Sequence, residues 1–123
     1  MNDQEPTVFV VDDDPGVADA IRLLLRSVGL TSEAFGSAKD FLESYDSGRA
    51  GCLVLDVRMP GMSGLELLEK IRTTYEKPPP VVMMITAYGD DHNRTTAEKL
   101  GANDFLTKPL DFSKLKEKLN ALS

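Results

Sequence analysis

The chain has 123 residues, of which 41% are hydrophobic and 28% charged, a composition typical of one globular domain with a single core. Its formal net charge of −6 argues against a nucleic-acid-binding surface in this segment, because domains that bind nucleic acids are usually basic. No apolar run approaches the roughly 20 residues of a membrane span, and the amino terminus lacks the apolar segment of a signal peptide. We therefore expect one cytoplasmic domain covering residues 1–123.

The first strand and the first helix are marked by a change of hydrophobic period. Residues 7–11 are apolar and mostly β-branched, which predicts a strand. Asp14 is expected to cap a helix that begins at Pro15, a favourable pairing, and Gly29 is expected to end that helix. Apolar residues recur along it at helical spacing, namely Val17, Ile21, Leu24, Leu25 and Val28.

The next two strands differ in character. Residues 30–35 predict a short strand with a polar middle, and Ser37 is expected to open the helix that follows. After a loop at 46–51, the apolar run Cys52–Leu55 predicts a strand that is buried on both faces and ends at Asp56. Because the only cysteine lies in this run, we expect an inert core thiol and no internal disulfide.

The second half of the chain repeats the alternation of strand and helix. Ser63 and Glu66 have the spacing of a capping box, and the helix they begin is expected to bury Leu65, Leu68 and Ile71. Strands are predicted at 81–86 and 104–107, with helices after each, of which the last is capped by Asp111. Five such alternations imply a parallel sheet covered by helices on both faces.

Polar side chains follow four of the predicted strands at the point where each strand ends. They are Asp12 and Asp13 after the first strand, Asp56 at the end of the third, Thr86 at the end of the fourth and Lys108 after the fifth. Because the carboxyl ends of parallel strands meet at one edge of a sheet, we expect these side chains to converge, as ligand sites do in such folds.

The charges of this group favour a bound divalent cation. Three carboxylates and one ammonium leave a local charge of −3 + 1 = −2, and unrelieved like charges in one cleft destabilise the fold. Carboxylates with room for water suit Mg²⁺, which favours sites that it shares with phosphate. A metal, a nucleophilic carboxylate, a hydroxyl and an ammonium together suit phosphoryl transfer.

Four motifs then carry a resemblance to a known family: VVDD at 10–13, LDVRMPGMSG at 55–64, ITA at 85–87 and FLTKP at 105–109. In this order and spacing, the chain resembles a response-regulator receiver domain of bacterial two-component signalling over nearly its whole length. The resemblance implies a flavodoxin-like, doubly wound five-stranded parallel sheet of order 2-1-3-4-5 with five helices.

The family's roles are transferred to matching positions of this sequence. The resemblance implies that Asp56 is the phosphoacceptor. Asp13 and Asp56 would ligate Mg²⁺ directly with the backbone carbonyl of Arg58, and Asp12 would act through bound water. Lys108 would contact the phosphoryl group.

The resemblance also implies a switch. Thr86 would be the switch hydroxyl, Phe105 the switch aromatic residue, and the backbone amides of Arg58 and Ala87 would donate hydrogen bonds to phosphoryl oxygens. The Arg58 side chain either folds over the mouth of the site or is solvated, and Tyr88 would flank the phosphoryl group. A cis peptide bond is expected before Pro109.

Two other protein classes share parts of this pattern. An aspartyl-phosphate hydrolase has a second Asp two residues after its nucleophile, where this chain has Arg58. A flavin-binding domain needs phosphate donors after the first strand, where Asp12, Asp13 and Asp14 would repel a phosphate. Neither alternative fits as well as a receiver.

The output of the switch has two interpretations. The chain is either the regulatory domain of a transcriptional response regulator or a stand-alone receiver that acts by protein contact or phosphorelay. No basic helix-turn-helix follows within this sequence, so we expect no direct contact with nucleic acid or membrane. We expect a sensor histidine kinase or phosphotransfer protein as partner and possible dimerisation through the fourth helix, fifth strand and fifth helix. Apart from its own phosphorylation and dephosphorylation, we expect no enzymatic activity.

Overall fold

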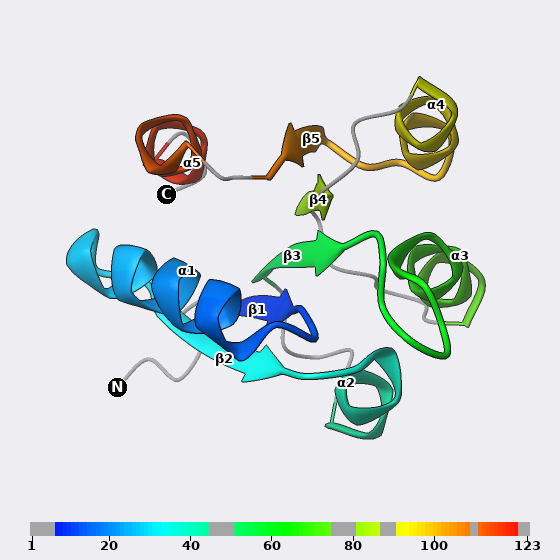
Figure 1. Ribbon diagram of the computed structural model, residues 1–123, viewed down its shortest axis with the longest axis horizontal. Coiled ribbons are helices and arrows are strands. Elements are labelled where there is room, and N and C mark those ends of the chain that lie inside the picture. Colours follow the sequence, from blue (N-terminus) through cyan, green and yellow to red (C-terminus); the bar gives the residue numbers. More distant parts are fainter. Residues whose placement is uncertain (1–6, 45–50, 75–80, 87–90, 109–110, 121–123) are drawn as a thin grey trace.

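The computed structural model describes residues 7–44, 51–74, 81–86, 91–108 and 111–120. Five strands alternate with five helices along these ranges (Figure 1). The strands are β1 (Thr7–Val11), β2 (Thr31–Phe35), β3 (Gly51–Asp56), β4 (Val81–Thr86) and β5 (Asp104–Thr107). The helices are α1 (Pro15–Ser27), α2 (Ala38–Ser44), α3 (Gly64–Thr74), α4 (Asp91–Lys99) and α5 (Phe112–Asn120).

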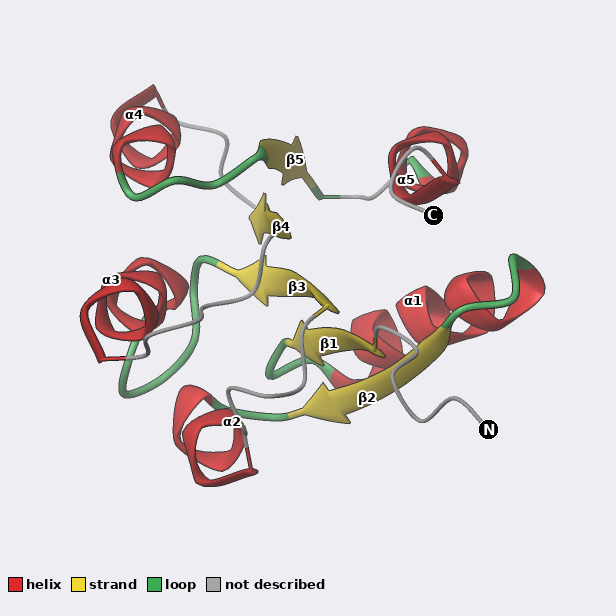
Figure 2. Ribbon diagram, turned by 180° about the vertical axis from the view of Figure 1, so that it is seen from behind, coloured by secondary structure: helices red, strands yellow, loops and turns green. Residues whose placement is uncertain are grey.

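The strands form one parallel sheet in the order β2-β1-β3-β4-β5, which confirms the predicted doubly wound topology. Helices α1 and α5 lie against one face of the sheet, and α2, α3 and α4 lie against the other (Figures 1 and 2). Strand β3 is therefore central and covered on both sides. Because all five strands are parallel, their carboxyl ends lie at the same edge of the sheet.

Two apolar layers hold the helices on the sheet. Successive residues of β1 point to opposite faces, so that Val8 packs into one layer and Phe9 into the other, and both are buried. This arrangement explains why β1, β3 and β4, in the middle of the sheet, are almost continuously apolar instead of alternating. Burial of this kind contributes about 25 cal/mol per Å² of apolar surface and is the main force that fixes the sheet.

Three helix starts follow the predicted capping signals. The Asp14 carboxylate accepts hydrogen bonds from the amides of Gly16 and Val17, and Pro15 is the first residue of α1. The Ser63 hydroxyl accepts from the Glu66 amide at 3.2 Å, and the Glu66 carboxylate accepts from the Ser63 amide at 3.0 Å. This reciprocal pair is a capping box. The Asp111 carboxylate caps α5 by accepting hydrogen bonds from the amides of Ser113 and Lys114, as Asp14 does for α1.

The buried stripe of α3 differs from the predicted one. Leu68 and Ile71 are fully buried as expected, but Leu67 is fully buried too, whereas Leu65 is only partly buried. Leu67 and Leu68 both belong to the apolar layer between α3 and the sheet, so the buried face of the helix is wider than the predicted stripe. On α1, Ala18 joins Ile21 and Leu25 in the core.

Several sequence-based expectations fall outside the described residues. They concern the loop at 46–50, the amide of Ala87, the position of Tyr88 and the peptide bond before Pro109. Within the described part of the chain, no helix combines the length and apolar character that crossing a membrane requires.

Candidate functional site

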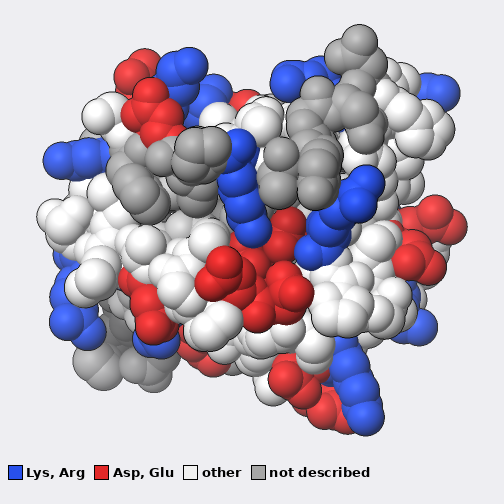
Figure 3. All heavy atoms as spheres, in the orientation of Figure 1, with Lys and Arg blue, Asp and Glu red and all other residues white. Residues whose placement is uncertain are grey.

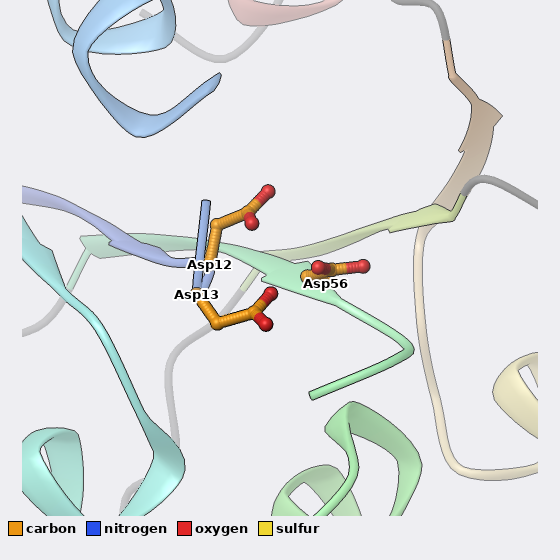
Figure 4. Close-up of side chains that lie close together, drawn as sticks. All are labelled: Asp12, Asp13 and Asp56. Carbon is orange, nitrogen blue, oxygen red and sulfur yellow. The ribbon is translucent and has the colours of Figure 1, made fainter. Parts of the chain in front are cut away.

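The carboxylate cluster, defined as Asp12, Asp13 and Asp56, lies where β1 and β3 end (Figure 4). Val11 is paired with Leu55 in the parallel register, so the residues that follow these two emerge side by side at the sheet edge. One carboxylate oxygen from each of the three residues lies within 4.8 Å of the others. The register of two strands therefore produces the convergence that the sequence predicts.

The three carboxylates differ in their contact with solvent. Asp12 is 1% exposed and Asp56 is 3% exposed, whereas Asp13 is exposed. Figure 3 shows acidic side chains gathered near the middle of one face of the molecule, with basic side chains beside them. Because Asp13 is exposed, the carboxylate cluster is in contact with solvent on one side.

Lys108 connects the two buried carboxylates. Its Nζ atom lies 3.1 Å from Asp12 Oδ2 and 3.3 Å from Asp56 Oδ2. It reaches this position because its backbone amide donates to the Thr86 carbonyl at 2.6 Å, which extends the β4–β5 pairing by one residue. One ammonium group thereby offsets part of the negative charge, as the sequence predicts.

The remaining charge perturbs the titration of the site. Burial raises the pKa of Asp56, and the neighbouring Asp12 raises it further, to about 6 from an ordinary value of 3.8, although Lys108 and the Arg58 amide lower it in part. Burial lowers the pKa of Lys108, but Asp12 and Asp56 more than offset this, so that its pKa is raised. Such shifts are common at functional sites because like charges are held together there.

The loop after β3 adds a backbone donor to the site. The Arg58 amide faces Asp56 Oδ1 at 3.3 Å, while the Arg58 side chain is exposed. The loop then returns sharply, so that the Gly64 amide donates to the Val57 carbonyl at 2.9 Å. A Cβ atom on Gly64 would lie 2.0 Å from the Asp56 carbonyl oxygen, so only glycine fits at this approach of α3 to the strand end.

The cluster is able to hold a metal ion. Asp12 Oδ1 accepts a hydrogen bond from the Asp14 amide at 2.9 Å, but the buried Oδ2 atom has no hydrogen bond, despite its ion pair with Lys108. A buried carboxylate oxygen without a hydrogen bond is unusual. Together with the converging oxygens of Asp13 and Asp56, it forms a donor set of the type that hard divalent cations prefer.

The two expected switch residues lie on neighbouring strands, Thr86 at the end of β4 and Phe105 in β5, where it pairs with Met84. Thr86 ends β4 and is fully buried, and its partner in the register is Thr107, which follows Phe105 by two residues. Phe105 is 8% exposed and packs into the layer under α2, α3 and α4. The Arg94 guanidinium lies over its ring at 5.0 Å from the centroid.

Sequence reasoning missed two arginines near this region. Arg94 on α4 covers Phe105, and Arg72 on α3 donates hydrogen bonds to the carbonyls of Leu100 and Gly101. Both are separated from their partners along the chain, and nothing in the local pattern distinguishes them from solvated arginines. Helix packing alone brings them into contact.

Comparison with known proteins identifies the family. A family model described as the response regulator receiver domain matches residues 8–120. The chain belongs to this family. The receiver is 45% identical over 109 residues to the response regulator protein TmoT of Ectopseudomonas mendocina, a match that covers 89% of this chain and 49% of the relative.

Two further matches agree with this. The receiver is 44% identical to the transcriptional regulatory protein TdiR of Thauera aromatica, over 94% of this chain and 50% of the relative. It superposes with a TM-score of 0.86 on the chemotaxis protein CheY4 of Vibrio cholerae, at 22% identity, covering 97% of this chain and 99% of that one. The latter match shows the fold. The receiver spans about half the length of the curated relatives it matches.

Proposed function

We propose that this receiver is a phosphorylation-activated switch that accepts a phosphoryl group on Asp56. The observation that supports it is the position of this carboxylate: it lies at the end of the central strand, beside the carboxylates of Asp12 and Asp13 and in an ion pair with Lys108. A carboxylate held in this way is suited to act as a nucleophile.

The proposed reaction is a displacement at phosphorus. A carboxylate oxygen of Asp56 forms the new bond as the bond from phosphorus to the donor atom breaks, and the electron pair of that bond leaves with the donor. The donor is a phosphohistidine of a sensor kinase or phosphotransfer protein, or a small acyl phosphate. Lys108 and the amides of Arg58 and Ala87 stabilise the phosphoryl oxygens.

The same proposal includes Mg²⁺. Asp13, Asp56 and the backbone carbonyl of Arg58 would hold it directly, and Asp12 would hold it through water. When bound, Mg²⁺ supplies positive charge that offsets the charge of the phosphoryl oxygens. The convergence of the three carboxylates and the residual negative charge of the cluster support this assignment.

The receiver acts on itself in this proposal and not on a separate substrate. The phosphoryl group adds about −1.5 to −2 charge, Thr86 moves toward it, and Phe105 occupies the space that this opens. The surface of α4, β5 and α5 then changes shape and controls the output. Because sensor kinases present their catalytic parts to the cytoplasm, we place the receiver there too.

The output proposed first is transcriptional. TdiR is named a transcriptional regulatory protein, and the receiver spans half of it. We therefore infer that the receiver regulates such an output, with dimerisation through α4, β5 and α5 as one route. The alternative is a stand-alone receiver that acts by protein contact or phosphorelay. The full reading frame distinguishes the two.

Intact-mass measurement tests the phosphoacceptor. The receiver is incubated with acetyl phosphate and Mg²⁺, and the wild type is expected to gain one phosphoryl group. Asp56→Asn should gain none, because it has no carboxylate at the strand end. Asp19→Asn, which changes an exposed aspartate on α1, is the matched control and should behave as wild type. Equal phosphorylation of Asp56→Asn and wild type would contradict the proposal.

A further inference from the structure

The peptide group between Val57 and Arg58 lies between the start of α3 and the Asp56 carboxylate. Its carbonyl oxygen, which belongs to Val57, accepts a hydrogen bond from the Gly64 amide at 2.9 Å. Its N–H, which belongs to Arg58, donates to Asp56 Oδ1 at 3.3 Å. A trans peptide group is planar, so its C=O and N–H bonds point in opposite directions. The hydrogen bond that directs the carbonyl toward α3 therefore directs the N–H toward the carboxylate.

The sheet fixes the other side of Val57. The Val57 amide donates to the Ile85 carbonyl at 2.8 Å, which continues the pairing of β3 with β4 by one residue. The Val57 side chain is buried in the apolar layer that α3 covers. Because the preceding peptide group is held by β4, the orientation of the next one depends on what the Val57 carbonyl meets. That partner is the amide of Gly64.

Glycine is required at position 64 for space and not for backbone conformation. Among the described residues, the glycines with positive φ are Gly29, Gly61 and Gly101, so the backbone conformation of Gly64 is open to residues with a side chain. A Cβ atom at this position, however, would lie 2.0 Å from the Asp56 carbonyl oxygen and 2.8 Å from the Asp56 carbonyl carbon. These are backbone atoms of the central strand, so the start of α3 would have to move outward and take its first amide with it.

The start of α3 is itself held, so the amide that it offers has a defined position. Ser63 and Glu66 bond to each other across the first turn, at 3.2 and 3.0 Å. Leu68 is fully buried in the apolar layer between α3 and the sheet. The first amides of a helix have no partner within the helix. The Gly64 amide is therefore available to the Val57 carbonyl, and its place is set by the cap and by the core.

We propose that Gly64 is a positioning residue of the phosphoryl site: through its amide it turns the Arg58 N–H toward the phosphoryl group on Asp56. This rests on the proposed function, in which that N–H donates a hydrogen bond to a phosphoryl oxygen. Donors that are oriented in advance stabilise negative charge without a cost of reorganisation. Gly64 acts through the peptide group that it orients and not by direct contact with the phosphoryl group.

Loss of this orientation should weaken the site without removing it. A hydrogen bond to a charged group changes an equilibrium by about ten- to a hundredfold. Gly64→Ala should thus weaken the binding of beryllofluoride, an analogue of the phosphoryl group, by up to that factor. The carboxylate cluster and Lys108 should stay in place, because the pairing of β1 with β3 and of β4 with β5 positions them.

The experiment compares four variants of the whole chain with wild type. Gly64→Ala tests the proposal directly. Ser63→Ala loosens the same helix start without adding a clash, and it tests the proposal if Gly64→Ala does not fold. Gly36→Ala is the matched control for replacing a glycine, because a Cβ atom there meets nothing within 4 Å. Ile71→Val destabilises α3 from its buried face and leaves the first turn unchanged.

Two NMR signals report the geometry, and one titration reports the site. The scalar coupling across the hydrogen bond from the amide of residue 64 to the Val57 carbonyl shows whether that bond is present. The chemical shift of the Arg58 amide proton follows the direction of the N–H. Titration with beryllofluoride at fixed Mg²⁺ gives the affinity of the site. Circular dichroism and thermal melting show whether each variant is folded and how stable it is.

The proposal expects Gly64→Ala to lose the coupling, to shift the Arg58 amide signal and to bind beryllofluoride about ten- to a hundredfold more weakly. Ser63→Ala should show smaller changes in the same direction, and Gly36→Ala and Ile71→Val should bind as wild type does. An unchanged Arg58 signal or affinity in Gly64→Ala, or an equal fall in Ile71→Val, would overturn it. If Gly64→Ala does not fold, the absence of any change in Ser63→Ala would do the same. If the wild type binds no beryllofluoride, the proposed function fails, and the two NMR signals still show on their own whether Gly64 orients this peptide group.

Discussion

Helices α1 and α4 cover opposite faces of the sheet and are attached to it in different ways. Helix α1 places Ala18, Ile21 and Leu25 in the core, and Ile21 and Leu25 are fully buried. Among the described side chains of α4, only Ala97 is fully buried. Apolar burial therefore fixes α1, whereas α4 has few buried side chains and depends more on polar contacts.

Two arginines supply the contacts of α4. Arg72 on α3 places Nε 3.1 Å from the Leu100 carbonyl oxygen and Nη2 3.0 Å from that of Gly101. These carbonyls follow the last turn of α4, where backbone acceptors lack helical partners and the helix dipole favours a cation. Arg94 adds the contact with Phe105. A helix held by a few polar contacts opens more easily than one held by a core, and elements that switch belong to this class.

The largest expected effect tests the attachment of α1. Leu25→Ala should lower the free energy of unfolding by about 2–5 kcal/mol, because it removes a fully buried side chain and leaves a cavity. Urea denaturation measures the change. Leu23→Ala is the matched control on the same helix, since Leu23 is 64% exposed, and it should stay within about 0.5 kcal/mol of wild type. Equal losses in the two variants would show that α1 is not held by its buried face.

A smaller effect tests the attachment of α4. Arg72→Met keeps the length of the side chain but removes two hydrogen bonds from a charged donor, and it should lower the free energy of opening of α4 by about 1–2 kcal/mol. Hydrogen exchange should become faster at the amides of α4 while those of α1 keep their protection. Arg26→Met is the control and should change neither helix. Uniform acceleration in both helices would mean that Arg72 stabilises the whole fold and not α4.

The carboxyl edge of the sheet gives an effect that depends on pH, because the pKa of Asp56 is perturbed there. The pKa of Asp56 is raised to about 6 from 3.8, so its protonated form favours the folded state. This contribution is fully present below about pH 4 and is lost as the pH rises to about 6. Stability should therefore fall across that window in wild type more than in Asp56→Asn, as thermal melting at several pH values measures.

Binding of Mg²⁺ provides a second comparison of wild type with Asp56→Asn. Since a proton and a metal ion compete for the Asp56 carboxylate, wild type should bind Mg²⁺ more weakly as the pH falls below about 6. In Asp56→Asn this dependence should largely disappear. Parallel pH profiles for the two proteins would place the metal elsewhere.

The sequence predicts the part of the molecule that local pattern determines. Apolar runs define the strands β1, β3 and β4, and Asp14 and the Ser63–Glu66 pair define helix starts, because each signal depends on residues a few positions apart. The convergence of Asp12, Asp13 and Asp56 follows from the rule that parallel strands end at one edge. These predictions do not require knowing how the side chains of different elements pack together.

The missed features depend on how helices rotate and pack. Leu67 is fully buried in the apolar layer between α3 and the sheet, although it lies outside the predicted stripe. Arg72 and Arg94 reach partners on other elements through long side chains, and a sequence pattern shows only that they are charged. For this reason the carboxylate cluster was predictable from the sequence, whereas the contacts of Arg72 and Arg94 were not.

The close approach of Gly64 to the Asp56 carbonyl has a consequence for how this region can evolve. The two ends of the loop 57–63 are held together, because Gly64 at the start of α3 packs against the backbone of Asp56. The Gly64 amide also donates a hydrogen bond to the Val57 carbonyl. Added residues would push the helix away from the strand end. Change in this loop must therefore come by replacing exposed side chains such as Arg58 and Pro60 and not by altering its length.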